Sequence, residues 1–405
     1  MRIPYGQGIL SLEIEEGRQV EVATPKVVPQ DPDAVLHSIR KPLDSVDFES
    51  FISAKRQILV VVNDHTRSTP TAQVLKQLEL KGKDVTTLIA SGSHRPPGPS
   101  EMENIFGGDA PPYGGKIAVH NCRDTSSLIE LGRTSRGTEL LFNSLLSEAD
   151  GIISLGSVEP HYFAGFTGGR KFLLPALAGF DSIAMNHSLA AEESAQVLAL
   201  EGNPVHEDFM EALRMFGRQE DIFSTQLVLN QDSQVSYAFS GDITKSFEHA
   251  VSYAREIYVP RVGKKADVVI SVNEPPLDID LYQSQKAIDN VKLAVNEGGI
   301  IILVSSCREG IGNEHFYKLL TSEPAAENSH KFGYHKVVKL RNLLKHVRIF
   351  TVTTLPSSIP RAIGLEPYSN VEDALRDATR IKGRGSSLLV VLNGANTVPL
   401  PQTEP

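Results

Sequence analysis

Apolar runs alternate with helical patterns along the first part of the chain. The segments GILSLEIEE and RQVEVATP alternate apolar and polar residues around Glu16-Gly17, which predicts an N-terminal hairpin. The apolar run at 58–64 predicts a buried strand, and 69–79 predicts a helix with a threonine cap. Further strands are expected at 85–93, 116–121 and 149–158, and helices at about 139–147, 204–216 and 243–257. Because parallel strands need crossover helices, this order predicts a mostly parallel sheet covered on both faces.

A second series of the same kind begins near Val262-Gly263. The segment YVPRVGKK (258–265) combines proline, glycine and basic residues, and it is the best candidate for a domain boundary. Beyond it, strands are expected at 266–274, 298–307, 347–353 and 387–393, and helices at about 282–295, 314–321, 336–345 and 371–381. The pattern therefore predicts two α/β domains with mostly parallel sheets, residues 1–262 and 263–405.

Composition narrows the class of protein. A chain of 405 residues, 40% hydrophobic and 22% charged, is typical of a globular protein with two domains. The net charge of -9 argues against nucleic acid as the main partner. Two cysteines, Cys122 and Cys307, leave no disulfide framework and indicate a reducing cytoplasm. No signal peptide and no apolar run of the ~18 residues needed to span a membrane is apparent, so a soluble cytoplasmic enzyme without a membrane partner is expected.

Polar, glycine- or proline-rich loops follow five of the expected strands. In open α/β sheets ligands bind at the carboxyl ends of the strands, so this clustering marks the functional region. The five loops are NDHTR, GSHRPP, GSVEPHYFAGFTGGRK, NEPPLD and SSCREGIG.

The first two loops offer an acid, a base and an oxyanion binder. Asp64 and Arg67 lie three residues apart at a strand-to-helix turn, and an arginine there suits a carboxylate or a phosphate. The alternative is a helix-capping aspartate beside an ordinary surface arginine. His94 lies on a turn followed by two prolines, where it is either a general base or a solvated side chain.

The phrase HYFAGFTGGRK (161–171) carries the densest chemistry. His161 ends a strand, and Gly168 and Gly169 allow close approach of the backbone to a ligand. Lys171 enters the apolar segment FLLPALAGF, where a buried lysine needs a partner, a lowered pKa or a covalent role. A phosphate-binding lysine at the end of a glycine turn remains the alternative.

Three other positions stand out further along the chain. His187 is either a histidine at a helix start or a metal ligand, although no HxH, HExxH or CxxC pattern accompanies it. Gln283 and Lys286 fall on one face at an expected helix start, where they would bind a substrate oxyanion or form a solvated face. Cys307 is expected to be a small buried thiol rather than a nucleophile.

Taken together, these phrases resemble a known family. DHTR, GSHR, HYFAGFTGGRK, Asn186-His187 and LYQSQK occur in the order found in the nickel-pincer-nucleotide lactate racemases and their relatives, which racemise or epimerise 2-hydroxyacids. The resemblance runs from about residue 58 to 310, and HYFAGFxGGxK is its most specific part.

The resemblance implies a particular cofactor. This nickel-pincer nucleotide is a mononucleotide derived from nicotinic acid, in which two sulfurs and a ring carbon hold nickel. Lys171 would be joined to it through a thioamide, His187 would be the protein ligand of nickel, and Asp64, Gly168 and Gly169 would contact the cofactor. Enzymes that make the cofactor would be the partners that load it.

The resemblance also implies a mechanism. One histidine, His94 or His161, would take the substrate hydroxyl proton while hydride passes from C2 to the cofactor, and the opposite histidine would act for the other enantiomer. Arg67, Gln283 and Lys286 would hold the carboxylate, and the active site would lie in the cleft between the two domains. Residues 1–262 would then carry the cofactor and both histidines, and residues 263–405 would contribute to substrate binding.

Both the substrate and the class of function have alternatives at the level of sequence. The chain has no tryptophan, whereas a lactate-specific relative carries one near its substrate, so malate, longer or aromatic 2-hydroxyacids and sugar acids are alternatives to lactate. The alternative class is a non-catalytic binding protein that holds a nucleotide or phosphate with the GGRK loop. An NAD-type dehydrogenase is ranked below both, because no GxGxxG follows the first strand of either domain.

Overall fold

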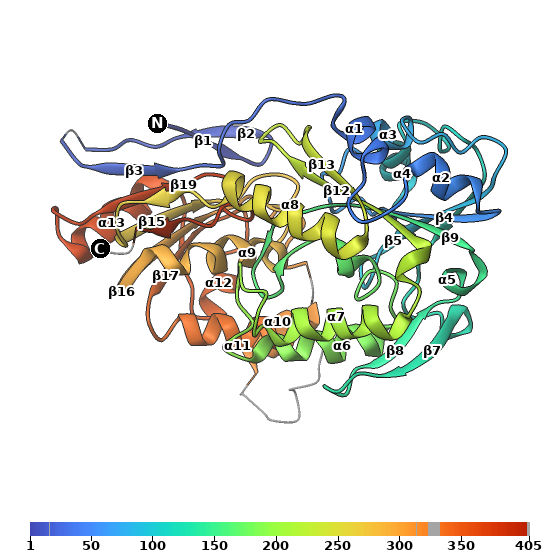
Figure 1. The fold of residues 1–405 in the computed structure, drawn as a ribbon. Coiled ribbons are helices and arrows are strands. Elements are labelled where there is room, and N and C mark those ends of the chain that lie inside the picture. Colours follow the sequence, from blue (N-terminus) through green and yellow to red (C-terminus); the bar gives the residue numbers. More distant parts are fainter. Residues whose placement is uncertain (16, 313, 323–332, 403–405) are drawn as a thin grey trace. The chain divides into compact units, whose positions relative to one another are not determined.

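The computed structural model describes residues 1–15, 17–312, 314–322 and 333–402 (Figure 1). The chain forms two compact units. The N-terminal unit consists of Val27–Glu159 and Phe163–Arg255, and the C-terminal unit consists of Met1–Lys26, Pro160–Tyr162 and Glu256–Pro405. This division differs from the expected boundary after residue 262, chiefly because the first 26 residues and the short segment 160–162 pack with the C-terminal unit.

A six-stranded sheet forms the centre of the N-terminal unit. Its order is β13-β12-β9-β4-β5-β6, and every neighbouring pair is parallel except β12 and β13. The strands span Val235–Gly241, Ile222–Leu229, Gly151–Ser157, Gln57–Asn63, Asp84–Ala90 and Lys116–Val119 in that order. The expected mostly parallel sheet is confirmed, and the apolar runs at β4, β5 and β9 form its central strands.

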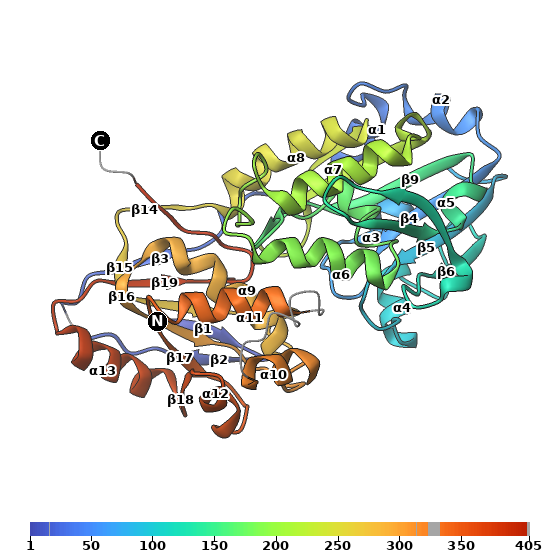
Figure 2. The same ribbon diagram turned by 90° about the horizontal axis from the view of Figure 1, so that it is seen from below.

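Helices cover this sheet. One face packs its core, which includes Phe51, Val60 and Phe223, against α1 (Ala34–Arg40), α2 (Phe48–Ser53), α3 (Thr71–Leu75) and α4 (Pro99–Phe106). The unit also contains α6 (Phe180–Ser188) and α7 (Pro204–Phe216), which lie side by side in Figure 2, and most of α8 (Ile243–Tyr258). Asn203 caps α7 by accepting hydrogen bonds from the N–H groups of Val205 and His206, and Gly217 ends that helix.

The helix expected at 139–147 is wrong over most of its length. Glu139–Asn143 is the strand β8, which pairs antiparallel with β7 (Leu128–Arg133), and only α5 (Leu145–Glu148) is helical. Leu140 and Phe142 are fully buried and lie two residues apart, as a strand with one covered face requires. A short apolar run fits both periods, and pairing with β7 decided between them.

The C-terminal unit contains a second six-stranded sheet, of order β18-β17-β16-β15-β19-β3, in which all pairs are parallel. Its strands span Glu366–Tyr368, Arg348–Val352, Val295–Val304, Ala266–Val272, Leu388–Val391 and Val20–Ala23. One core includes α9 (Leu281–Val291), α10 (Glu314–Thr321) and α11 (Tyr334–Leu343), and a second includes α13 (Val371–Lys382) and the N-terminal hairpin. Smaller elements are α12 (Ser358–Ala362) and the parallel pair β14 (Arg261–Val262) and β20 (Leu400–Pro401).

The expected hairpin around Glu16-Gly17 is also wrong, and Glu16 itself lies outside the described residues. The hairpin pairs β1 (Arg2–Tyr5) with β2 (Gly8–Ser11), and the turn uses Gly6 at a φ of 56°. The later strand β3 instead pairs parallel with β19, far along the chain. Alternation of apolar and polar residues identifies a strand but does not identify its partner.

Candidate active site

Asp64 and His94 form a hydrogen-bonded pair at the carboxyl ends of β4 and β5. Asp64 is buried, and its Oδ2 lies 2.7 Å from Nδ1 of His94, while its Oδ1 accepts from the Thr66 hydroxyl at 2.7 Å. Burial opposes ionisation of Asp64, but the charge of His94 and these hydrogen bonds prevail and lower its pKa to about 2. An ionised carboxylate only accepts, so Nδ1 of His94 carries the proton and donates it to Asp64. In the neutral ring, Nε2 is then an acceptor.

The loop that carries His94 is fixed to the next helix. Arg95 donates to both carboxylate oxygens of Glu101 in α4, at 2.7 and 2.6 Å, and the N–H of Gly98 donates to the same carboxylate at 2.7 Å. Hydrogen bonding from Arg95 is the largest cause of a pKa of about 2 at Glu101. Arg67 belongs to the turn of Asp64, because its N–H donates to the Asp64 carbonyl at 3.3 Å. Asp64 therefore shapes this turn and does not cap α3, whose N-cap is Pro70.

The glycines of the GGRK turn are required by close packing. Gly168 and Gly169 have φ values of 78° and 50°, and the N–H of Gly169 donates to the Gln226 side chain of β12 at 2.7 Å. A Cβ at position 168 would lie 2.6 Å from the Gln226 oxygen, and one at 169 would lie 2.7 Å from Phe247 of α8. The turn thus lies with its backbone directly against a strand and a helix, and a side chain at either position would force them apart.

Lys171 and His187 lie against the same aromatic ring. The Nζ of Lys171, a buried residue, is 5.7 Å from the centre of the Phe163 ring and 5.6 Å from that of Phe209. The His187 ring meets Phe163 edge to face with 5.1 Å between centroids. His187 lies in the last turn of α6, so the expectation of a helix-start histidine is wrong. Two residues that the sequence singled out separately are thereby brought together.

Arg170 points into the protein rather than towards a ligand. It is 1% exposed, and its guanidinium donates to the carbonyls of Ala164 and Gly168, at 2.9 and 3.3 Å. The Phe247 ring lies 4.2 Å from its Cζ, and burial lowers its pKa to about 9. Arg170 therefore stabilises the loop that carries Lys171. Of the basic pair Arg170-Lys171, this arginine is not placed to bind an anion.

Sequence reasoning missed the network that holds α6. Asp208 of α7 is fully buried and accepts from the hydroxyls of Thr134 and Thr138 at 2.6 and 2.8 Å. It also accepts from the side chain of Asn186, the residue before His187, at 2.8 Å. The only signal in the sequence was an aspartate on the apolar face of α7, which pattern analysis treats as a surface residue.

His161 belongs to a different unit from His94. It lies in the short strand β10 (Pro160–His161), is buried, and stacks on the ring of Tyr162 with 5.1 Å between centroids. The segment Pro160–Tyr162 is assigned to the C-terminal unit, which also contains Gln283 and Lys286. The sequence-predicted residues therefore divide into two sets, one in each unit.

Gln283 and Lys286 lie at the start of α9, as expected. Asp280 caps this helix, with its Oδ1 accepting from the N–H of Gln283 at 2.6 Å, and the Ser284 hydroxyl donates to the Asp280 carbonyl at 2.6 Å. Both predicted substrate-binding side chains are only partly buried. The first turn of α9 is thus fixed at its backbone, and Gln283 and Lys286 lie in the first two turns of the helix.

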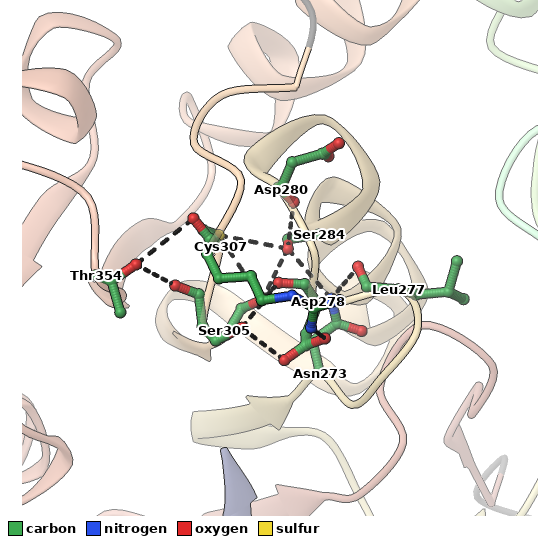
Figure 3. Close-up of polar contacts among 10 residues, drawn as sticks. Asn273, Leu277, Asp278, Asp280, Ser284, Ser305, Cys307 and Thr354 are labelled. Carbon is green, nitrogen blue, oxygen red and sulfur yellow. Dashed lines mark hydrogen bonds and ion pairs between the residues drawn. The ribbon is translucent and has the colours of Figure 1, made fainter. Parts of the chain in front are cut away.

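A buried polar network supports this turn from the side of the sheet (Figure 3). Ser284 shares a hydrogen bond of 2.7 Å with Ser305, which follows β16, and the Asn273 amide donates to Ser284 at 3.2 Å. Cys307 completes the network at 3.5 Å from Ser284. Burial raises the pKa of its thiol to about 11, so the expectation of a small buried thiol is confirmed.

Known proteins with similar sequences identify the family. A model described as the lactate racemase N-terminal domain matches residues 5–198, and one described as the lactate racemase C-terminal domain matches residues 262–398. The chain is 27% identical to the lactate racemase of Thermoanaerobacterium thermosaccharolyticum and 28% identical to that of Lactiplantibacillus plantarum, with 98% of each chain covered in both cases. The chain belongs to the lactate racemase family.

Solved structures agree with this membership. The lactate racemase apoprotein from Thermoanaerobacterium thermosaccharolyticum superimposes with a TM-score of 0.89, covering 98% of this chain and 99% of that one. A Thermotoga maritima protein of 18% identity shares the fold, with a TM-score of 0.67. As a member of the lactate racemase family, the protein is an isomerase of the racemase type. No helix among the described residues is long and apolar enough to cross a membrane.

Proposed function

We propose that this family member racemises or epimerises a 2-hydroxyacid with a nickel-pincer nucleotide. The observation that carries the proposal is the shared position of Lys171 and His187 on the Phe163 ring, beside a glycine turn that lies flat against β12 and α8. An amine and an imidazole on one apolar surface suit a cofactor that is tethered covalently to the chain and also bound to it through a metal.

The donor set supports such a cofactor. Among the described residues, no three histidine, cysteine or acidic side chains are grouped to hold a metal by themselves. A metal bound through His187 would therefore take its remaining ligands from an organic molecule, as the nickel of this cofactor does. Lys171 would be the tether and His187 the nickel ligand, and Gly168 and Gly169 would contact the cofactor through their backbone. Asp64 would support this site through His94 and Arg67. When bound, the cofactor would supply reversible hydride acceptance from C2 of the substrate.

His94 and His161 would move the hydroxyl proton. With Nδ1 of His94 donating to Asp64, its Nε2 is left as the acceptor for the substrate proton, and the Asp64 charge stabilises the imidazolium that forms. His161 would act in the same way for the opposite enantiomer, whose hydroxyl points to the other side of C2. Two bases are needed because a single one cannot reach both hydroxyl positions.

Arg67, Gln283 and Lys286 would hold the substrate carboxylate. Arg67 shares the turn of Asp64, which places a positive charge beside the base. Gln283 and Lys286 extend from the first two turns of α9, whose start is fixed by the Asp280 cap, and the Lys286 ammonium would supply the positive charge for the anion. A fixed carboxylate orients C2 for both enantiomers.

The substrate class follows from chemistry common to the family. The two curated relatives are lactate racemases, so lactate is the first substrate to test. The chain contains no tryptophan, and the panel should therefore extend to malate, longer aliphatic, aromatic and sugar 2-hydroxyacids. All of them share the α-hydroxy carboxylate that the proposed residues would contact.

Intact-mass spectrometry tests the cofactor. The protein is co-produced with the cofactor-making enzymes, and we expect a mass increment located on Lys171 together with stoichiometric nickel. Lys171→Ala should lack the increment, and His187→Ala should keep the increment but lose nickel. Unmodified wild-type protein under conditions that load a known lactate racemase would contradict the proposal and favour a simple binding protein.

Isotope retention tests the chemistry. Loaded enzyme is given a 2-deuterated 2-hydroxyacid in ordinary water. If C2 gives up a hydride, the racemised product keeps its deuterium; if a base removes a proton from C2, the deuterium is washed out into the solvent. Washout during racemisation would exclude the proposed route.

A further inference from the structure

A buried lysine that is not among the proposed site residues contacts two segments that carry such residues. Lys336 of α11 is 1% exposed, and its Nζ donates to the carbonyl of Tyr282 at 2.7 Å. The same Nζ lies 4.0 Å from the centre of the Tyr282 ring and 4.7 Å from that of Tyr162. The ammonium therefore sits against two tyrosine rings and ends on a backbone carbonyl.

Such a group is costly to bury, so its contacts must compensate. Burial lowers the pKa of Lys336 to about 8, opposed by the charges of Asp289 and Asp280. The aromatic faces and the carbonyl attract the charged form. A methionine would fill a similar volume at this position without those demands, which indicates that the charge has a use.

His335, the residue before Lys336, makes a second contact with Tyr162. The hydroxyl of Tyr162, which is 3% exposed, lies 3.0 Å from Nε2 of His335, the residue before Lys336. The backbone carbonyl of Lys336 also accepts from the Gln285 side chain of α9 at 2.8 Å. The start of α11 is therefore bonded both to Tyr162 and to α9.

The two residues that Lys336 contacts are direct neighbours of proposed site residues. Tyr162 follows His161 and stacks on its ring, and Tyr282 precedes Gln283 in the first turn of α9. All of these residues belong to the C-terminal unit. A shift of the Lys336 side chain would therefore act on a base and on a carboxylate anchor at once.

We propose that Lys336 is a positioning residue that fixes His161 and the first turn of α9 relative to each other. The proposal rests on the function proposed above for His161, Gln283 and Lys286. Lys336 does not itself move a proton; it acts through Tyr162 and the Tyr282 carbonyl. Displacements of about 1 Å at a reacting group can cost about 10²-fold in rate, so a single remote lysine can matter.

Hydrogen exchange on the protein without cofactor tests the positioning. In Lys336→Met, we expect faster amide exchange in peptides covering 160–162 and 281–286, with unchanged exchange in the sheet strands β15 and β16. Lys318→Met, which removes an exposed lysine from α10 of the same unit, is the matched control and should behave as wild type. Unchanged exchange in both peptides, or a general increase throughout the unit, would overturn the proposal regardless of any activity.

Kinetics of the loaded enzyme provide the second readout. Lys336→Met should lower kcat by about 10- to 100-fold and raise KM, while the Lys171 mass increment and the nickel content stay at wild-type values. Lys336→Arg, which keeps a cation, should restore most of the activity. In a Lys286→Ala background, Lys336→Met should cost less than it does alone, because part of its effect passes through the start of the same helix, α9. Fully multiplicative effects would count against the proposal, and an inactive wild type would count only against the proposed function.

Discussion

At the scale of single residues, the Asp64–His94 pair shows how a buried carboxylate sets the chemistry of an exposed histidine. The His94 side chain is 36% exposed, whereas the Asp64 side chain is 3% exposed, so the carboxylate is buried while part of the ring faces solvent. Because Asp64 stays ionised, it fixes both the tautomer and the orientation of His94. Sequence inspection placed the two residues on neighbouring loops but assigned Asp64 to the cofactor, without the bond to His94.

Replacement of the carboxylate by an amide should separate these effects. In Asp64→Asn we expect kcat of the loaded enzyme to fall by about 10²- to 10⁴-fold with little change in KM, because the amide no longer enforces the tautomer. Asp47→Asn is the matched control, since Asp47 also accepts hydrogen bonds, from Ser50, but on the surface. Equal kinetics for wild type and Asp64→Asn would show that His94 does not depend on the pair.

The same carboxylate gives a pH-dependent contribution to stability. The folded pKa of Asp64 is about 2 against an ordinary value of 3.8, so the contribution is present above about pH 4 and is lost as the pH falls towards 2. The difference corresponds to about 2 kcal/mol of unfolding free energy. Denaturant titrations at pH 5 and pH 2.5 should show a smaller loss in Asp64→Asn than in wild type. A parallel loss in both proteins would exclude Asp64 as its source.

At the scale of elements, α9 and α13 begin with the same kind of N-cap, but only α9 carries proposed substrate-binding residues. Asp280 caps α9 and Asn370 caps α13, each with an extended backbone and a side-chain oxygen that accepts from the N–H three residues on. The cap of α9 is surrounded by the buried Ser284 network, whereas α13 packs on the sheet next to the N-terminal hairpin. Variants of the two caps can therefore separate an effect on stability, expected at both helices, from an effect on substrate binding, expected only at α9.

Removal of either cap should cost stability, but only one should affect the substrate. We expect Asp280→Ala and Asn370→Ala each to lower the free energy of unfolding by about 1 kcal/mol. Only Asp280→Ala should also raise KM of the loaded enzyme, because Gln283 and Lys286 lose their fixed start. Denaturant midpoints and racemisation kinetics measure the two effects. A KM increase of similar size in Asn370→Ala would argue against a special role for α9.

At the scale of the whole molecule, the proposed site residues are divided between two units. His94, Arg67, Lys171 and His187 belong to the N-terminal unit, and His161, Gln283 and Lys286 belong to the C-terminal unit. The division assigns the proposed cofactor residues to one unit and one of the two proposed bases to each. Neither base is a proposed tether or metal ligand, so loss of a base should leave cofactor retention intact.

Single alanine variants of the two histidines test this separation. His94→Ala and His161→Ala should each lower the racemisation rate by at least about 10²-fold while they keep nickel and the Lys171 mass increment. His249→Ala, which removes an exposed histidine of α8, serves as the control. Metal analysis and chiral product assays give the readouts. Near-normal turnover in either histidine variant would contradict the model with two bases.

Much of the fold was predictable because buried parallel strands appear in the sequence as continuous apolar runs. The apolar runs at β4, β5, β9, β15, β16 and β19 were each identified from sequence, and so were α7, α8 and α13. The failures occurred where a local pattern fits more than one partner. Residues 139–143 became a strand only because β7 pairs with them, and β3 joined β19 instead of folding back on its neighbour.

By itself, the sequence determined the class of fold, the family and the candidate site residues, because these depend on local periodicity and on motifs of fixed spacing. Tertiary structure alone decided which of those residues meet. It joined Asp64 to His94 and set Lys171 and His187 on one phenylalanine ring. It also turned Arg170 inward and buried Lys336 between two tyrosines. Such contacts depend on long-range packing and burial, and no local pattern encodes the partner of a buried charge.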